Sequence, residues 1–185
     1  MQDSPNSNDR NWQILNESEV YSGYRKVIRR RYQLPDNQQA DFDLMKNHDS
    51  CCILALTVDN KVILARQFRP GPGTVLLELP GGGIELGEDP IIAASRELAE
   101  ETGYTGELLL VNSTPVDAYS TSTRYHFIAK NCSQQFEIQN DEHEHTEVVL
   151  LDLPDFISHL QNGQLTDVAS GYIGLDALKL IQYEI

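Results

Sequence analysis

The sequence has little cysteine, little positive charge and no long apolar run, and each shortage excludes a class of protein. Its 185 residues include only Cys51, Cys52 and Cys132, too few for a disulfide framework. Lysine and arginine total 14 against 28 acidic residues, and the net charge of −14 lacks the basic footprint of a general nucleic-acid binder. No stretch approaches the ~18 apolar residues of a membrane span. We expect a cytoplasmic protein with reduced cysteines and without nucleic-acid or membrane partners.

The chain is expected to contain a tail, a strand-rich segment and one larger domain. Residues 1–10, MQDSPNSNDR, have no basic start followed by an apolar run, so they predict a disordered tail and not a secretory signal. Residues 11–48 are too few for a core of their own, and we expect them to pack on the body or on a second subunit. Residues 49–185 predict the main domain.

Two sets of side chains in the strand-rich segment each have two interpretations. The basic residues either hold phosphates or solvate and guard an exposed strand. The tyrosines either stack a nucleobase or fill a subunit interface, which we favour. These residues are Lys26, Arg29, Arg30, Arg31, Tyr21, Tyr24 and Tyr32.

Apolar runs and turn signals predict the elements of the main domain. Residues 52–58 and 62–66 flank the turn Asp59-Asn60 and predict a hairpin of two buried strands. Further strands are expected at 75–79, 108–111, 125–129 and 147–151, a helix at 156–161, and a last helix capped by Asp167 that carries Ile173, Ala177, Leu180 and Ile181. The pattern predicts an α+β fold with a mixed sheet between helices and a small N-terminal antiparallel β-region.

The most informative stretch, residues 82–104, predicts a glycine turn followed by one short helix. Asp89 has the position of an N-cap, and Pro90 has the first helical position, where its missing N–H costs nothing. Gly103 suits the left-handed residue after the last turn. These signals predict where the helix begins and ends.

This helix is expected to bury one face and to crowd carboxylates on another. The predicted core face consists of Ile91, Ala94 and Leu98. Glu97, Glu100 and Glu101 follow at i, i+3 and i+4, so three like charges lie together near the negative end of the helix dipole. Such a run is either a solvated helix face or a cluster of the hard oxygen ligands that Mg²⁺ and Mn²⁺ take.

The order of residues over the whole stretch matches the Nudix box, G-x5-E-x7-R-E-U-x-E-E-x-G-U. The matching residues are Gly82, Glu88, Arg96, Glu97, Leu98, Glu100, Glu101 and Gly103. Only Tyr104 departs, at a position where the family usually has an aliphatic residue. The chain therefore resembles the Nudix hydrolases, in which water attacks a phosphorus of a nucleoside diphosphate linked to another group. The resemblance also implies the Nudix fold, a mixed sheet sandwiched between helices (α/β/α).

The resemblance implies a site for about one to three Mg²⁺ (or Mn²⁺) ions. Glu97 and Glu101 would be the principal ligands, Glu100 would share the cluster, and the carbonyl of Gly81 would be a further ligand. Glu100 and Arg96 fall in the catalytic group, Arg96 as the residue that pairs with an acid of the box and fixes the loop on the helix.

In similar enzymes the general base comes from outside the box. The candidate segment is the loop 140–147, NDEHEHTE, which matches the loop that supplies a catalytic glutamate in ADP-ribose pyrophosphatases. Aligning on the strand that follows favours Glu144, then Glu142; the alternative is an acidic loop without a role. His143 and His145 offer only a weak pattern for a softer metal such as Zn²⁺.

Three stretches resemble the ADP-ribose and nucleoside-diphosphate-sugar branch: the N-terminal strands, QFR at 67–69 with ELPGG at 78–82, and GQLTDV at 163–168. Glu78 is expected to brace the glycine loop. The candidate substrate-binding residues are Arg69, Gln67, Ser120, Thr121 and Arg124. The hydroxyls among them either bond phosphate or sugar groups or cap a turn.

One departure leaves the substrate within this branch open. ADP-ribose pyrophosphatases carry a proline beyond the box where this chain has Tyr119 and Ser120. The expected function is hydrolysis of ADP-ribose or a related nucleotide sugar to a nucleoside monophosphate and a sugar phosphate. The alternatives are a hydrolase of dinucleoside polyphosphates or another nucleotide conjugate, and a Nudix-fold sensor that binds a nucleotide without cutting it. The branch further implies a homodimer whose N-terminal strands exchange across a two-fold axis.

Overall fold

The structure, a computed structural model, describes residues 11–138 and 145–181. Contacts divide the chain into two units, residues 1–47 with 115–122 and residues 48–114 with 123–185, and each is described by itself. The strands are β1 (Gln13–Ser22), β2 (Lys26–Gln33), β3 (Gln39–Met45), β4 (Ser50–Thr57), β5 (Val62–Arg69), β6 (Thr74–Glu78), β7 (Tyr104–Pro115), β8 (Thr123–Gln134) and β9 (Glu147–Leu151). The helices are α1 (Pro90–Thr102), α2 (Leu153–Gln161) and α3 (Val168–Ala177).

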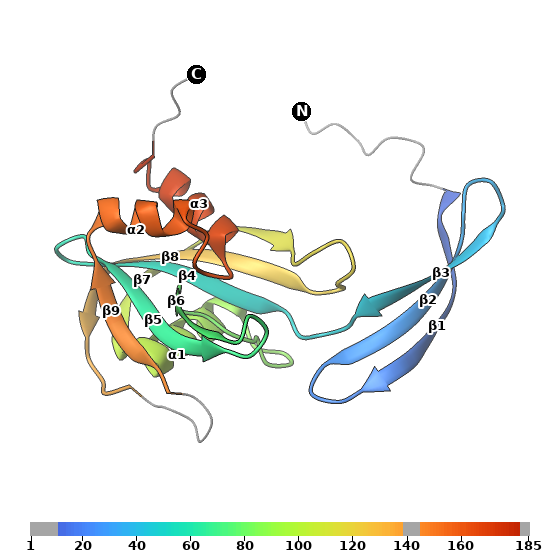
Figure 1. The fold of residues 1–185 in the computed structure, drawn as a ribbon, viewed down its shortest axis with the longest axis horizontal. Coiled ribbons are helices and arrows are strands. Elements are labelled where there is room, and N and C mark those ends of the chain that lie inside the picture. The colour runs from blue at the N-terminus through green and yellow to red at the C-terminus, as the bar shows by residue number, and fades with distance from the viewer. Residues whose placement is uncertain (1–10, 139–144, 182–185) are drawn as a thin grey trace. The chain divides into compact units, whose positions relative to one another are not determined.

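The first unit is built on an antiparallel sheet in the order β1-β2-β3, as predicted (Figure 1). Its register places basic residues of β2 opposite acids of its two neighbours. The resulting ion pairs are Arg29–Asp43, Arg30–Glu17 and Arg31–Asp41, at 2.6–2.8 Å. These arginines are therefore engaged within the sheet, which favours the surface interpretation of the basic run over phosphate binding.

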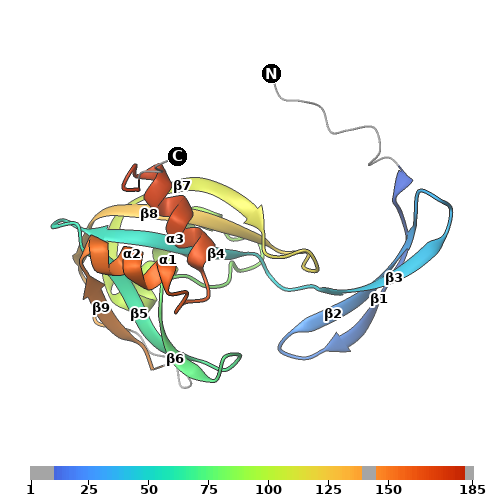
Figure 2. The same ribbon diagram turned by 45° about the horizontal axis from the view of Figure 1, so that its top comes forward.

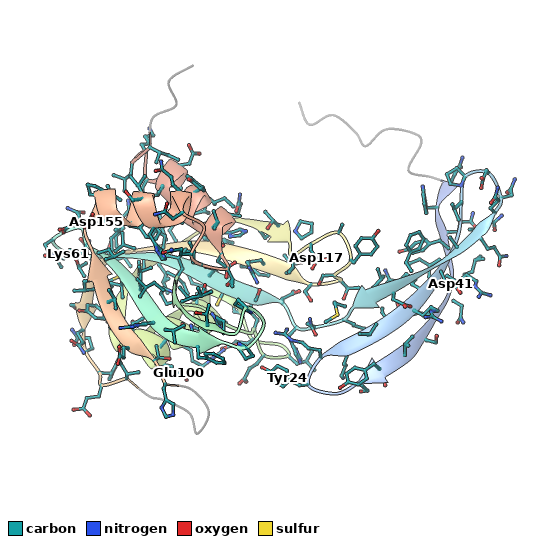
Figure 3. All side chains as sticks on the ribbon, in the orientation of Figure 1. Tyr24, Asp41, Lys61, Glu100, Asp117 and Asp155 are labelled. Atoms are coloured by element: carbon teal, nitrogen blue, oxygen red, sulfur yellow. The ribbon has the colours of Figure 1, made fainter. Side chains whose placement is uncertain are left out.

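The tyrosines of this sheet occupy different surroundings. Tyr32 packs edge-on against Trp12 and Phe42, with ring centroids 5.9 and 5.8 Å away. Tyr24, labelled in Figure 3, lies at the turn between β1 and β2. It is 97% exposed, and Tyr21 is 59% exposed. Tyr32 thus fills a small aromatic cluster, whereas the other two rings are presented to solvent within this unit.

The loop before β8 joins the first unit through backbone hydrogen bonds to the end of β3. Met45 N–H donates to the carbonyl of Tyr119 at 2.7 Å, and Thr121 N–H donates to the carbonyl of Met45 at 2.9 Å. Residues 115–122 are consequently grouped with the N-terminal strands. Nothing in the local sequence of this loop had pointed to β3.

The second unit contains the predicted mixed sheet between helices. The strand order is β6-β5-β4-β8-β7, with β9 paired to β5. β4 and β8 run parallel, whereas β5 is antiparallel to β4, β6 and β9. α1 lies on one face of the sheet and α2 and α3 lie on the other (Figures 1 and 2).

β4 is buried on both faces, which explains its continuous apolar run. Alternate residues of the strand supply two cores. Cys51, Ile53 and Ala55 pack with α1, whereas Cys52, Leu54 and Leu56 pack with α2 and α3. The three cysteines of the chain are all buried and free, and burial raises the pKa of Cys51 and of Cys132 to about 11. All three are therefore packing residues of the core.

Two expectations about the C-terminal part need correction. α3 ends at Ala177, so Leu180 and Ile181 follow the helix instead of lying on it. Asp167 has the N-cap position of α3, as expected, but its side chain makes no capping hydrogen bond and pairs with Arg124 instead. Among the helices that the structure describes, none is long and apolar enough to cross a membrane.

Candidate active site

The helix α1 has the boundaries that its sequence signals predict. The Asp89 side chain accepts a hydrogen bond from Ile91 N–H at 3.0 Å, and Gly103 closes the helix in the left-handed region with φ 73°. The buried face consists of Ala93, Ala94, Leu98 and Thr102. Ile91, expected on that face, is 42% exposed, because it lies in the first turn beyond the edge of the core.

The glycine loop before α1 is bound to the edge of β4. Cys51 N–H donates to the carbonyl of Gly82 and Ile53 N–H to that of Pro80, both at 2.9 Å. A Cβ at Gly81 would collide with the backbone carbonyl of Cys51, and one at Gly82 would lie 2.6 Å from the Glu97 carboxylate. At Gly81 the obstacle is backbone, so only glycine allows the loop to pass this closely to β4, whereas at Gly82 the flexible Glu97 side chain could move aside.

Arg96 binds three carboxylates of the box and the loop. Its guanidinium donates to Glu88 at 3.1 Å through two nitrogens, to Glu97 at 2.7 Å and to Glu100 at 3.1 Å. It also donates to the carbonyl of Gly83 at 3.0 Å. The fork geometry of a guanidinium suits this shared contact, and it fixes the glycine loop against the helix.

The box carboxylates differ in exposure. Glu100, labelled in Figure 3, has 43% of its side chain exposed, against 13% for Glu88 and 14% for Glu97. Within residues 11–138 and 145–181, no three His, Cys, Asp or Glu side chains gather as a metal-binding group. Glu100 is instead directed to Arg96.

Glu101 is the carboxylate whose ionisation is most perturbed. Burial is the main reason that its pKa rises from 4.5 to about 7, and the negative charge of Glu97 adds to the rise. A hydrogen bond from Gly81 N–H, at 2.8 Å, opposes the shift, as do the charge of Arg69 and a 3.4 Å contact from Gln67 Nε2. The carboxylates of Glu97 and Glu101 therefore both lie beside the glycine loop and repel each other.

The candidate substrate residues Gln67 and Arg69 lie on β5, beside this pair. Residues two apart on a strand share a face, so Arg69 is on the same side of β5 as Gln67, which contacts Glu101. Arg69 Nε lies 3.5 Å from the carboxylate of Glu78, which is fully buried. We expected Glu78 to brace the glycine loop. Its carboxylate instead accepts hydrogen bonds from Thr166, so it holds the segment that precedes α3.

The remaining candidates are divided between the two units. Arg124, at the start of β8, pairs with Asp167 and donates from Nε to Ser50 Oγ at 3.2 Å. Ser120 Oγ accepts from the N–H of Ser122 at 3.1 Å, which is a turn-capping contact, and Thr121 Oγ1 donates to the carbonyl of Met45 at 3.4 Å. Ser120 and Thr121 belong to the first unit, whereas Arg124 belongs to the second with the box.

The candidate general bases Glu144 and Glu142, with His143, lie outside the described residues. His145 is exposed. Two residues that contact the candidate site were missed as such from the sequence, namely Thr166 and Asp167. The resemblance of residues 163–168 pointed to their segment but not to their partners, which lie 88 and 43 residues away in the sequence.

Comparison with known proteins identifies the family of the chain. The NUDIX domain family matches residues 46–168. The chain is 31% identical over 147 residues to an ADP-ribose pyrophosphatase of Bacillus subtilis, covering 76% of this chain and 77% of that protein. It is 26% identical over 176 residues to a methanol dehydrogenase activator of Bacillus methanolicus, covering 89% of this chain and 94% of the relative.

A solved structure shares the fold. The crystal structure of an ADP compounds hydrolase superposes with a TM-score of 0.79 at 22% identity, and the match covers 91% of this chain and 95% of the other. The box residues, the glycine loop bound to β4 and the mixed sheet between helices are thus accompanied by a family match over most of the chain. This chain belongs to the Nudix family of hydrolases.

Proposed function

We propose that this protein hydrolyses the pyrophosphate of a nucleoside diphosphate linked to another group, with ADP-ribose or a related nucleotide sugar as substrate. The observation that carries the proposal is the pair Glu97 and Glu101, held beside a glycine loop in which a Cβ at Gly81 would collide with the backbone of β4. Similarity to the ADP-ribose pyrophosphatase of Bacillus subtilis supports the substrate class. The expected products are a nucleoside monophosphate and a sugar phosphate.

Nudix hydrolases generally use divalent metal ions, and the donor set beside the loop fits one. Burial and Glu97 both disfavour the ionised form of Glu101 and raise its pKa to about 7, whereas a cation between the two carboxylates would favour that form. Carboxylate and carbonyl oxygens are hard ligands suited to Mg²⁺. We assign Glu97, Glu101 and the carbonyl of Gly81 as ligands, with Glu100 as a further one. When bound, the ion neutralises charge on the pyrophosphate and acidifies the attacking water.

The chain's own residues bind and align the substrate in this proposal. Arg69, which is paired with Glu78, and Arg124, which donates to Ser50, bind phosphate oxygens together with the amide of Gln67. Such binding matters because phosphoryl transfer depends on alignment and charge neutralisation more than on a covalent residue. Glu144, or else Glu142, takes the proton from the attacking water. Arg96 keeps the box carboxylates in place.

The first unit supplies the subunit contact in this proposal. Residues 11–48 act as a dimerisation region and residues 49–185 as the catalytic domain, with Ser120 and Thr121 available to the substrate's sugar or phosphate. Exposed apolar side chains on β1, Ile14, Leu15, Val20 and Tyr21, support an interface there. A cytoplasmic location is supported by the free, buried cysteines. Light scattering should give a dimer for the full chain and a monomer after removal of residues 1–45; a dimeric truncation contradicts the assignment.

Product analysis tests the function directly. The purified protein is incubated with about 5 mM Mg²⁺, enough for an exchangeable site, and with ADP-ribose, nucleotide sugars, NADH, a dinucleoside polyphosphate and 8-oxo-dGTP. AMP and ribose 5-phosphate from ADP-ribose are the expected products. Cleavage of only one of the other compounds would assign the protein to that substrate class instead. Tight binding without cleavage would show that the protein is a nucleotide sensor.

A further inference from the structure

Two adjacent residues between α2 and α3 are linked to the two candidate substrate arginines, one through a shared carboxylate and one directly. Thr166 donates twice to the Glu78 carboxylate, from Oγ1 at 2.9 Å and from its N–H at 3.1 Å. Asp167 pairs directly with the guanidinium of Arg124. The two contacts reach different strands, β6 and β8, from one short connection.

Glu78 connects Thr166 to Arg69. Its side chain is fully buried, it accepts hydrogen bonds from Thr166, and Arg69 Nε lies 3.5 Å from its Oε1. That nitrogen is itself buried and forms no hydrogen bond. Arg69 also interacts with the charge of Glu101, but its ion pair is with Glu78. Charge attraction, and not a directional bond of Nε, therefore holds the base of the guanidinium, so a shift of the Glu78 carboxylate would change where the guanidinium lies.

The carboxylate is in turn placed by Thr166, because a buried carboxylate needs donors to replace water. Glu78 is also the last residue of β6, three positions before Gly81, whose N–H binds Glu101. A shift of Glu78 would accordingly affect both Arg69 and the start of the glycine loop.

Arg124 is held in a comparable way on the opposite side of β4. Its Nε donates to Ser50 Oγ, and Ser50 forms an isolated bridge with Gly83 of the glycine loop. Asp167 takes another nitrogen of the same guanidinium. The orientation of Arg124 beside the loop thus depends on Asp167, as that of Arg69 depends on Thr166.

We propose that Thr166 and Asp167 form a positioning element that orients the two substrate arginines, Thr166 through Glu78 onto Arg69 and Asp167 directly onto Arg124. The proposal rests on the proposed function, because it assigns both arginines to the pyrophosphate of the substrate. If these two residues only attached the connection between α2 and α3 to the sheet, contacts at any position on the sheet would serve. Here both contacts end at the candidate phosphate-binding cations, where a small displacement weakens binding.

Substitutions at Thr166 separate positioning from anchoring. Thr166→Val keeps the shape of the side chain and the backbone N–H contact but removes the Oγ1 bond to a charged acceptor, so KM for ADP-ribose should rise roughly tenfold with little change in kcat. Thr166→Ser keeps the hydroxyl and should restore the wild-type KM. Equal KM values for the valine variant and the wild type would overturn the Thr166 arm.

A double-mutant cycle tests the route through Glu78. If Glu78 acts through Arg69, Glu78→Gln should raise KM in the wild type but have much less effect when Arg69 is already Gln. Additive effects of the two changes would contradict the route. Asp167→Asn should raise KM in the same manner, and its effect should vanish in an Arg124→Gln background; persistence of the full effect there contradicts the direct contact.

The same samples distinguish failure of this inference from failure of the proposed function. Calorimetry with a non-hydrolysable methylene analogue of ADP-ribose measures affinity without turnover. Wild-type binding with weaker binding by Thr166→Val and Asp167→Asn supports the positioning element. Wild-type binding that both variants match overturns the element and leaves the function intact. Neither binding nor cleavage of ADP-ribose by the wild type refutes the ADP-ribose assignment, and the positioning element falls with it.

Discussion

The N-terminal sheet and the box helix both concentrate charge, but they neutralise it differently. In the sheet, each arginine at 29–31 has its own carboxylate within 2.8 Å. Around α1, one guanidinium, that of Arg96, is shared by Glu88, Glu97 and Glu100. The sheet is electrically balanced by residues of this chain, whereas the helix carries an excess of negative charge.

The difference indicates where the carboxylates outnumber the cationic side chains that could pair with them. Exposed, balanced pairs contribute little to stability, since water screens them. A buried carboxylate beside another one is costly unless a positive charge joins them. Glu101 is in that situation, because burial and Glu97 raise its pKa to about 7. We therefore infer that the uncompensated carboxylates at α1 serve function, whereas the paired charges of the N-terminal sheet serve structure.

The largest expected effect comes from removing the negative charge at Glu101. Glu101→Gln keeps an oxygen for the Gly81 N–H but removes a proposed metal ligand, so kcat should fall by about 10²–10³-fold, the scale of losing one electrostatic stabiliser. Steady-state assays with ADP-ribose measure it, and exposed Glu137→Gln is the matched control. Near-normal turnover by the Glu101 variant would break the contrast between helix and sheet.

The second prediction concerns the stability of the metal-free protein between pH 4.5 and 7. The pKa of Glu101 in the folded state is raised from 4.5 to about 7, so the folded state binds this proton more tightly than the unfolded state does. Proton binding at Glu101 therefore stabilises the fold at low pH, and this contribution to the free energy of unfolding is lost as the pH rises from 4.5 to about 7. The difference amounts to about 3 kcal/mol at 1.36 kcal/mol per pKa unit. Urea unfolding of wild type and Glu101→Gln with a chelator should show the variant gaining relative stability as pH rises.

A pH-independent difference between these two proteins would contradict the raised pKa. Adding Mg²⁺ at pH 8 supplies a second comparison. The ion should raise the unfolding temperature of the wild type much more than that of Glu101→Gln, because only the wild type offers both carboxylates.

The third prediction addresses the shared arginine. Arg96→Gln leaves three carboxylates without their common cation and should lower the free energy of unfolding by about 2 kcal/mol, less than for a fully buried pair. Arg96→Lys keeps the charge but cannot reach all three acids at once, so its free energy of unfolding should lie between those of the wild type and Arg96→Gln. Denaturant titration at pH 7 without added metal measures both, and a lysine variant as stable as wild type would show that charge alone suffices.

The smallest effect is expected in the sheet. Arg29 and Asp43 are about half exposed, at 48% and 51% of their side chains. The double change Arg29→Gln with Asp43→Asn should alter the free energy of unfolding by less than about 1 kcal/mol and leave kcat and KM for ADP-ribose unchanged. A loss of activity would assign this face of the sheet a part in the site and weaken the comparison.

Local signals predicted the elements better than the contacts between them. Asp89, Pro90 and Gly103 place α1 correctly, because caps act over a few residues. The continuous apolar run of β4 likewise predicts burial on both faces. The strand order does not follow from such signals, since β4 pairs with β8 from far along the chain.

The candidate site shows the same division. The spacing of the box predicts which carboxylates share a helix face, and the structure places Arg96 among them. It does not predict that Ile91 is exposed, because helical spacing alone cannot say how far the core extends. Nor does it reveal Thr166 at Glu78, a contact that depends on how the connection between α2 and α3 folds back over the sheet.

The backbone bonds between β4 and the glycine loop have a consequence for motion. The amide hydrogens of Cys51 and Ile53 are committed to the loop carbonyls of Gly82 and Pro80, while their side chains lie in the α1 core. The loop therefore has no independent opening of low free energy; it detaches only when the central strand is released. Slow amide exchange at these two residues would show that the site persists for as long as the fold itself, so that the catalytic geometry and global stability share one cooperative unit.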